Sequence, residues 1–177
     1  MADNDVDDDD DLLVSPETDW DDRDFVLAAV GHTGLAIRRA SERLQADRDV
    51  ILRAVRQNGR ALEFASDGLR ADRKIVLAAV GKWAIALEFA SDDLRDDRDV
   101  VLRAVRKWGV ALKHASDRMR ADREIITIAA KRNSAALKYA SEDLRAEFGA
   151  DDRGRQLGTG AVTLSRAGVA GNPTTTK

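Results

Sequence analysis

A short repeat of constant length runs through the middle of the chain and limits the folds that it can adopt. The dipeptide Asp-Arg recurs at 22–23, 47–48, 72–73, 97–98 and 122–123, and Ala-Ser recurs at 40–41, 65–66, 90–91, 115–116 and 140–141. No insertion interrupts this spacing, so five units follow one another at 22–46, 47–71, 72–96, 97–121 and 122–146. A fixed period of this length is typical of stacked repeats, in which each unit packs on its neighbours.

Each unit reads as two short helices joined by a turn. The aspartate that opens a unit, such as Asp22, can cap the first helix by accepting hydrogen bonds from its free N–H groups. An apolar run such as FVLAAV at 25–30 follows, and a motif such as ALEFAS marks the second helix. Between them, Gly34, Gly59 and Gly109 are expected to adopt the left-handed conformation that ends many helices. We therefore predict an all-α fold, a short α-solenoid of five 25-residue helix-turn-helix (αα-hairpin) repeats.

One continuous helix is the alternative, because the length of one unit is close to a whole number of helical turns and would keep each position on one face. The glycines at regular intervals and the capping residue at the start of every unit argue against it. The run at 25–30 is also apolar all round, whereas a single solvated helix would carry an apolar stripe.

Charge divides the chain into an acidic end and a basic body. Residues 1–22 hold eleven acidic residues and no Lys or Arg, whereas residues 23–146 hold 25 Lys and Arg against 18 acidic residues, a net charge of +7. We expect an acidic disordered tail at 1–21, the repeats at 22–146, and a flexible tail rich in Gly and Thr at 147–177.

The composition also bears on location. The chain has no cysteine, which excludes disulfides and Cys-ligated metals, and no apolar stretch long enough to span a membrane. Its N-terminus is acidic, whereas a secretory signal begins with basic residues. We expect an intracellular, cytoplasmic protein that does not bind membranes.

A column of serines raises the question of a repeated active site, and we expect a structural role for it instead. A nucleophilic serine needs a base within hydrogen-bond reach, and the chain holds only two histidines. We predict that each serine caps the turn after its second helix and that the protein is not an enzyme. The serines are Ser41, Ser66, Ser91, Ser116 and Ser141.

No cofactor or metal site is expected. His114 shares a position with Phe64, Phe89 and Tyr139 of other units, which predicts a half-buried packing residue, and His32 is expected to be exposed. The glycines at 154–168 lack the Gly-Lys-Ser/Thr of a phosphate-binding loop.

The units differ most in basic and aromatic residues, which form the candidate binding site. Units two and four share LRAVR, at 52–56 and 102–106, and units one and three have Ala and Gly at the two arginine positions, so a 50-residue period overlies the 25-residue one. If the first helices line one side of the array, these residues form a discontinuous basic strip. The candidates are Arg53, Arg56, Lys82, Trp83, Arg103, Arg106, Lys107, Trp108, Lys131 and Arg132.

Three interpretations of this strip stay open. A regular scaffold with variable surface positions favours binding of a protein or peptide partner through one face. Tryptophans beside cations favour single-stranded nucleic acid, with the acidic N-terminal tail as a competitor. The cations are also compatible with a solvated surface, and Trp83 and Trp108 with packing at the hairpin turn.

The unit DRDVVLRAVRKWGVALKHAS at 97–116 resembles the repeat of the family named domain of unknown function 4116, whose typical unit reads DREVVLAAVKQNGxALEYAS. The resemblance covers all five units. Unit one departs most, with GHTG at 31–34 and with Arg39 in place of an aromatic residue, so we expect looser packing there. The resemblance implies tandem helical repeats and no established activity.

Overall fold

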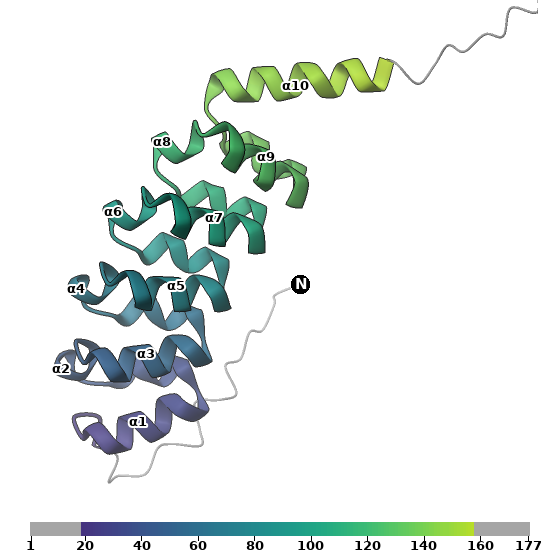
Figure 1. Cartoon of the computed structure of the whole chain (residues 1–177). Coiled ribbons are helices and arrows are strands. Elements are labelled where there is room, and N and C mark those ends of the chain that lie inside the picture. Colours follow the sequence, from purple (N-terminus) through teal and green to yellow (C-terminus); the bar gives the residue numbers. More distant parts are fainter. Residues whose placement is uncertain (1–18, 158–177) are drawn as a thin grey trace, which may run out of the picture.

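The computed structural model describes residues 19–157 and shows a single elongated array of helices (Figure 1). Five units stack in chain order from α1 at one end to α10 at the other, and consecutive units lie side by side. Every element within the described range is helical. The predicted all-α repeat fold is confirmed.

Each unit begins with a ten-residue α-helix, and these first helices contact one another in succession along the array. They are α1 (Arg23–His32), α3 (Arg48–Gln57), α5 (Arg73–Lys82), α7 (Arg98–Lys107) and α9 (Arg123–Arg132). The predicted aspartate caps are confirmed in all five, since the Asp22 carboxylate accepts from one backbone N–H and its four counterparts accept from two each.

The second helix of each unit is a six-residue 3-10 helix. These helices are η2 (Gly34–Arg39), η3 (Gly59–Phe64), η4 (Ala84–Phe89), η5 (Gly109–His114) and η6 (Ser134–Tyr139). A one-turn α-helix then joins the unit to the next one. These connectors are α2 (Glu42–Gln45), α4 (Asp67–Arg70), α6 (Asp92–Arg95) and α8 (Asp117–Arg120).

The expected left-handed glycine turn is wrong. No residue between 19 and 157 has a positive φ, and the first helix ends on an extended residue such as Asn58, at φ −139°. Gly34, Gly59 and Gly109 open the 3-10 helix instead. A Cβ at Gly34 would lie 2.5 Å from the Ala54 carbonyl oxygen of the following unit, so glycine serves close packing between units here.

The core runs the length of the array between the first helices and the 3-10 helices. The first helices contribute buried pairs such as Ile75 and Val76, and each 3-10 helix contributes a buried alanine such as Ala86. Most 3-10 helices add a buried Leu or Ile, such as Leu87. Small side chains at the alanine positions let neighbouring backbones approach closely. Units therefore cover one another's apolar faces, as expected for a solenoid.

One backbone hydrogen bond recurs at every joint between units. The N–H of each serine in the serine column donates to the carbonyl of the residue 21 positions earlier, at distances from 2.8 to 3.1 Å. Ser91, for example, donates to Arg70. The serine column therefore marks the point at which one unit is bonded to the unit before it.

Residues outside the predicted array close its ends. Trp20 packs edge-on against Phe25 at a centroid distance of 5.1 Å, and the Arg39 guanidinium lies 4.7 Å above the Trp20 ring. Arg39, which stands at the aromatic position of the other units, therefore contacts an aromatic ring from outside the repeats. At the other end, α10 (Glu142–Leu157) continues past residue 146 and packs Phe148 against the core. The remaining parts of the two predicted tails lie outside the described residues.

Candidate partner-binding face

A ladder of ion pairs runs along the first turns of the first helices. Each Arg of the Asp-Arg motif in the first four units reaches the capping aspartate of the following unit, as Arg73 does to Asp97 with 3.0 Å between Nε and Oδ2. The next acidic position adds a second partner, Asp99, at 2.7 Å from Arg73 Nη2. The Asp-Arg motif therefore caps a helix with its aspartate and joins two units with its arginine.

The ladder shifts the protonation of its aspartates. The hydrogen bond from Arg23 holds the pKa of Asp47 below its usual value, and backbone N–H groups of the helix add to this effect against partial burial. Arg73 lowers the pKa of Asp97 in the same way. These carboxylates stay ionised at neutral pH and belong to the structural frame.

Two arginines farther along the first helices make a different contact. Arg53 crosses from α3 to Gly31 on α1, where a Cβ would lie 2.8 Å from the Arg53 Nε. Arg103 repeats this contact over Gly81, on α5. A glycine in units one and three therefore leaves the space that an arginine of the next unit occupies.

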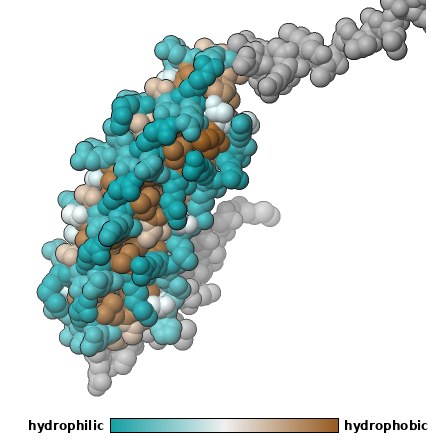
Figure 2. Space-filling model, in the orientation of Figure 1, coloured by the Kyte–Doolittle hydropathy of each residue, from teal (hydrophilic) through white to brown (hydrophobic). Residues whose placement is uncertain are grey.

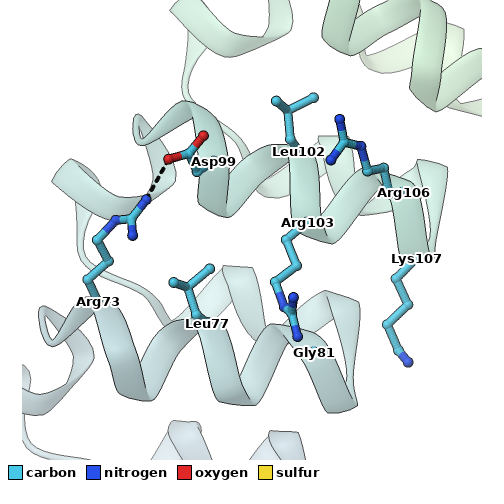
Figure 3. Close-up of a pocket in the computed structure, with 8 residues that line it drawn as sticks. All are labelled: Arg73, Leu77, Gly81, Asp99, Leu102, Arg103, Arg106 and Lys107. Carbon is cyan, nitrogen blue, oxygen red and sulfur yellow. Dashed lines mark hydrogen bonds and ion pairs between the residues drawn. The ribbon is translucent and has the colours of Figure 1, made fainter.

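A hollow of about 560 Å³ lies over the junction of α5 and α7. Leu77 and Leu102 form its apolar part, and the Arg73–Asp99 ion pair lies at one end. Figure 3 shows Arg103 extending from α7 toward Gly81, whereas Arg106 points away from α5. Lys107, on the last turn of α7, completes the basic end.

A second hollow, of about 500 Å³, lies two units earlier over the junction of α1 and α3. It repeats the first with Leu27, Leu52, Gly31, Asp49, Arg53 and Arg56 in the matching positions. Gln57 replaces Lys107 and donates to the His32 carbonyl at 2.9 Å. The 50-residue period of the sequence thus produces two matching hollows.

The junction between α3 and α5 lacks these features. Ala78 stands where Arg53 and Arg103 stand in their units, and Lys74 stands where an acidic residue receives the ladder arginine. Arg48 accordingly pairs with Asp72 alone, at 2.9 Å. The arginines at positions 53, 56, 103 and 106 of the predicted discontinuous strip therefore fall into two separate basic loci, one at each hollow.

Four arginines of the two hollows differ from the ladder arginines in having no acidic partner within the described residues. Within residues 19–149, no ion pair or hydrogen bond involves the side chains of four exposed arginines in the predicted strip. They are Arg53, Arg56, Arg103 and Arg106. Guanidinium groups without a partner, beside an apolar surface, can bind carboxylate or phosphate groups bidentately.

The other predicted site residues lie outside the two hollows. Trp83 is half-buried and stacks on Phe89 at 6.3 Å, and together with Lys82 it lines another hollow, of about 490 Å³. Trp108 is 44% exposed. Lys131 and Arg132 are exposed at the end of α9, where no further unit packs. The structure therefore does not bring the two tryptophans and all of the cations into one site.

Sequence reasoning missed the leucines of the first helices, Leu27, Leu52, Leu77 and Leu102, as part of the face. The apolar runs that contain them indicate core positions, but three of the four are only partly buried. The signal available in the sequence was that these leucines recur every 25 residues beside arginines that recur every 50 residues. Figure 2 shows hydrophobic residues gathered in a line along the array with hydrophilic residues on both sides.

The serines of the column lie at the starts of the connectors. Serine takes the N-cap position of each connector, but of the four hydroxyls at α2, α4, α6 and α8 only that of Ser116 accepts from the helix backbone, at 3.2 Å from Met119 N. The predicted capping is therefore wrong for Ser41, Ser66 and Ser91. Ser41 and Ser116 donate to acidic residues of the preceding joint, Asp21 and Asp96.

The histidines lie as predicted. His114 is half-buried, with Nδ1 at 3.9 Å from the Glu88 carboxylate, and burial lowers its pKa. His32 is exposed. Within the part of the chain that the structure describes, no three His, Asp or Glu side chains come together as a metal site. None of the described helices is both long and apolar enough to cross a bilayer.

A family model described as domain of unknown function (DUF4116) matches residues 22–70, 72–120 and 97–145. Each match spans two units, and the first two coincide with the pairs of units that form the two hollows. No curated protein matches the chain, and no solved structure matches it.

Proposed function

The chain belongs to the family of domain of unknown function DUF4116, and we propose that it is a non-catalytic scaffold that binds an acidic protein or peptide through the face of its first helices. One observation carries the proposal. Four arginines on this face have no acidic partner within the described residues, although most other arginines of the array are paired.

The contrast matters because surface arginines in this chain readily find partners. The ladder arginines bond to the next unit, and Arg118 bonds to Asp96 at 2.7 Å. Leaving four arginines beside partly buried leucines contributes little to folding, since isolated surface charges are worth at most a few tenths of a kcal/mol. A carboxylate-bearing partner would supply both the missing counter-charges and the apolar cover.

The test is a pull-down with two matched pairs of charge reversals. R103E/R106E changes the face, and K113E/K138E makes the same change in net charge on η5 and η6, at exposed lysines outside both hollows. Partners identified by mass spectrometry and then reconstituted from purified protein should be lost with the first variant and kept with the second. Equal recovery of the partners by both variants would show that this face does not bind them.

Single-stranded nucleic acid is the second candidate, supported by Trp83 and Trp108 beside Lys82 and Lys107. The acidic segment at 1–18 would then compete with the strand. Deleting residues 1–18 should raise affinity for oligo-dT, and affinity should fall steeply with salt. Binding that is absent, or unchanged between about 50 and 200 mM salt, excludes this candidate.

A further inference from the structure

We infer that the two hollows act together on one extended peptide and bind two acidic groups separated by the distance between the hollows. The inference rests on the proposed function and adds the spacing and chemistry of the ligand. Its starting point is the repetition of the same side chains at 50-residue spacing, with a junction between them that carries neither the crossing arginine nor the second acid.

Each hollow offers the same two kinds of contact. Arg103 crosses the junction to the space above Gly81, and Arg106 points away from α5 (Figure 3). Both have donors available for a carboxylate, which a guanidinium can bind through two parallel hydrogen bonds. Beside them, the partly buried Leu77 offers an apolar surface, and the more deeply buried Leu102 lines the hollow. A ligand that fits has acidic side chains with an apolar residue close by.

The acid at the far end of each hollow is already engaged. Asp99 bonds to Arg73, and Asp49 bonds to Arg23 at 3.1 Å. Each hollow therefore has a neutralised end and a basic end, so acidic groups should bind only at the arginines. This polarity gives an extended ligand two defined points of attachment instead of a uniform basic track.

The spacing of the ligand follows from the repeat. Packed helices lie about 8–10 Å apart, so equivalent points two units apart are separated by about 16–20 Å. An extended peptide rises about 3.3 Å per residue and covers this distance in about five or six residues. Joining two weak sites through one ligand raises its overall affinity by the effective concentration of the second group.

The test uses fluorescence anisotropy with the full chain and labelled peptides that carry two Asp-Asp pairs. The two pairs are separated by a spacer of either one or four residues. Each spacer contains one leucine, and any other spacer residues are Gly or Ser. The longer spacer should bind at least tenfold more tightly than the shorter one. The variant R53E/R56E should abolish this preference, whereas K113E/K138E should keep it.

The outcomes separate the two proposals. If binding depends on the arginines but both peptides bind with equal affinity, the inference that one ligand bridges the two hollows is wrong. The proposed function then still stands. A spacer preference that survives in R53E/R56E also overturns that inference. If no peptide binds in an arginine-dependent way, the proposed function fails as well. Tighter binding of a twelve-nucleotide oligo-dT than of either peptide would assign the face to nucleic acid and overturn the inference.

Discussion

Arg103 of α7 lies over Gly81 of α5, and a Cβ atom at position 81 would lie 2.7 Å from the Arg103 Nη2. The contact joins a glycine in one unit to an arginine in the next, and Gly31 and Arg53 repeat it two units earlier. The arginine side chain is flexible and the glycine lies within a helix. A substitution of the glycine can therefore change binding without reducing the stability of the fold.

Gly81→Ala should displace Arg103 without weakening the fold. Alanine is favoured over glycine inside a helix by about 0.5–1 kcal/mol, so the melting temperature should stay the same or rise. Affinity for an acidic peptide should fall severalfold, because the guanidinium loses its place. Thermal unfolding and fluorescence anisotropy measure the two effects.

The control for this variant is Gly68→Ala on α4, where an added Cβ meets nothing within 4 Å. It should raise stability by a similar amount and leave affinity unchanged. If Gly81→Ala binds as well as the original chain, the position of Arg103 over glycine has no part in recognition.

Gly59→Ala should destabilise the array. Its Cβ would press against the Ala79 carbonyl and lie 2.9 Å from the Trp83 backbone nitrogen, and neither atom can move without shifting the next unit. Overpacking of this kind costs about 1–3 kcal/mol. Urea unfolding measures the change, and a gain in stability would contradict the close approach. Ala84 occupies the same position in unit three and is buried, so its junction accommodates a methyl group that the Gly59 junction does not.

The sequence predicted the features that depend on contacts within one unit better than those that depend on contacts between units. The 25-residue period, the aspartate caps and the packing of His114 follow from local rules, and all of them are confirmed. The role of Gly34 was misread because close approach to Ala54 depends on contacts between units, which a single unit does not contain.

The candidate site was predicted in part for the same reason. The arginines were found because they break the 25-residue pattern. Their division into two loci depends on Gly31 and Gly81, whose importance appears only when one first helix lies beside the next. Trp83, for which both binding and packing at the hairpin turn were open, stacks on Phe89 of its own unit.

Substitutions at Asp97 should distinguish its contribution as a helix cap from its contribution as the ion-pair partner of Arg73. Asp97→Ala loses both the helix cap and the pairing with Arg73, and loss of a cap alone costs about 0.5–2 kcal/mol. Asp97→Asn keeps a good cap and loses only the charge, so it should cost less than the alanine variant. Chemical denaturation of both variants makes the comparison, and equal losses would show that the cap contributes little.

The ion-pair ladder should make stability depend on acid. Arg23 and Arg73 hold the pKa of Asp47 and of Asp97 below the unfolded value of about 4, so each pair stabilises the fold at neutral pH. This contribution is lost as the pH falls through the folded pKa. The melting temperature should therefore drop between about pH 5 and pH 2, and Asp97→Asn should flatten the drop. A melting temperature that is constant over this range would contradict the role of the ladder.

The serine column offers the sharpest comparison between units, since the same residue has different surroundings in each. Ser116 donates to Asp96 and accepts from Met119, so Ser116→Ala should cost about 0.5–2 kcal/mol as the loss of a cap.

The Ser91 hydroxyl is buried with no hydrogen-bond partner among the described residues, because Ala71 stands where Asp96 stands for Ser116. Removing a buried hydroxyl that lacks a partner relieves a desolvation cost, so Ser91→Ala should leave stability unchanged or raise it. Both serines donate their backbone N–H to the preceding joint, which alanine preserves. Urea unfolding of the two variants therefore isolates the hydroxyl, and equal destabilisation would show that the column acts alike in every unit.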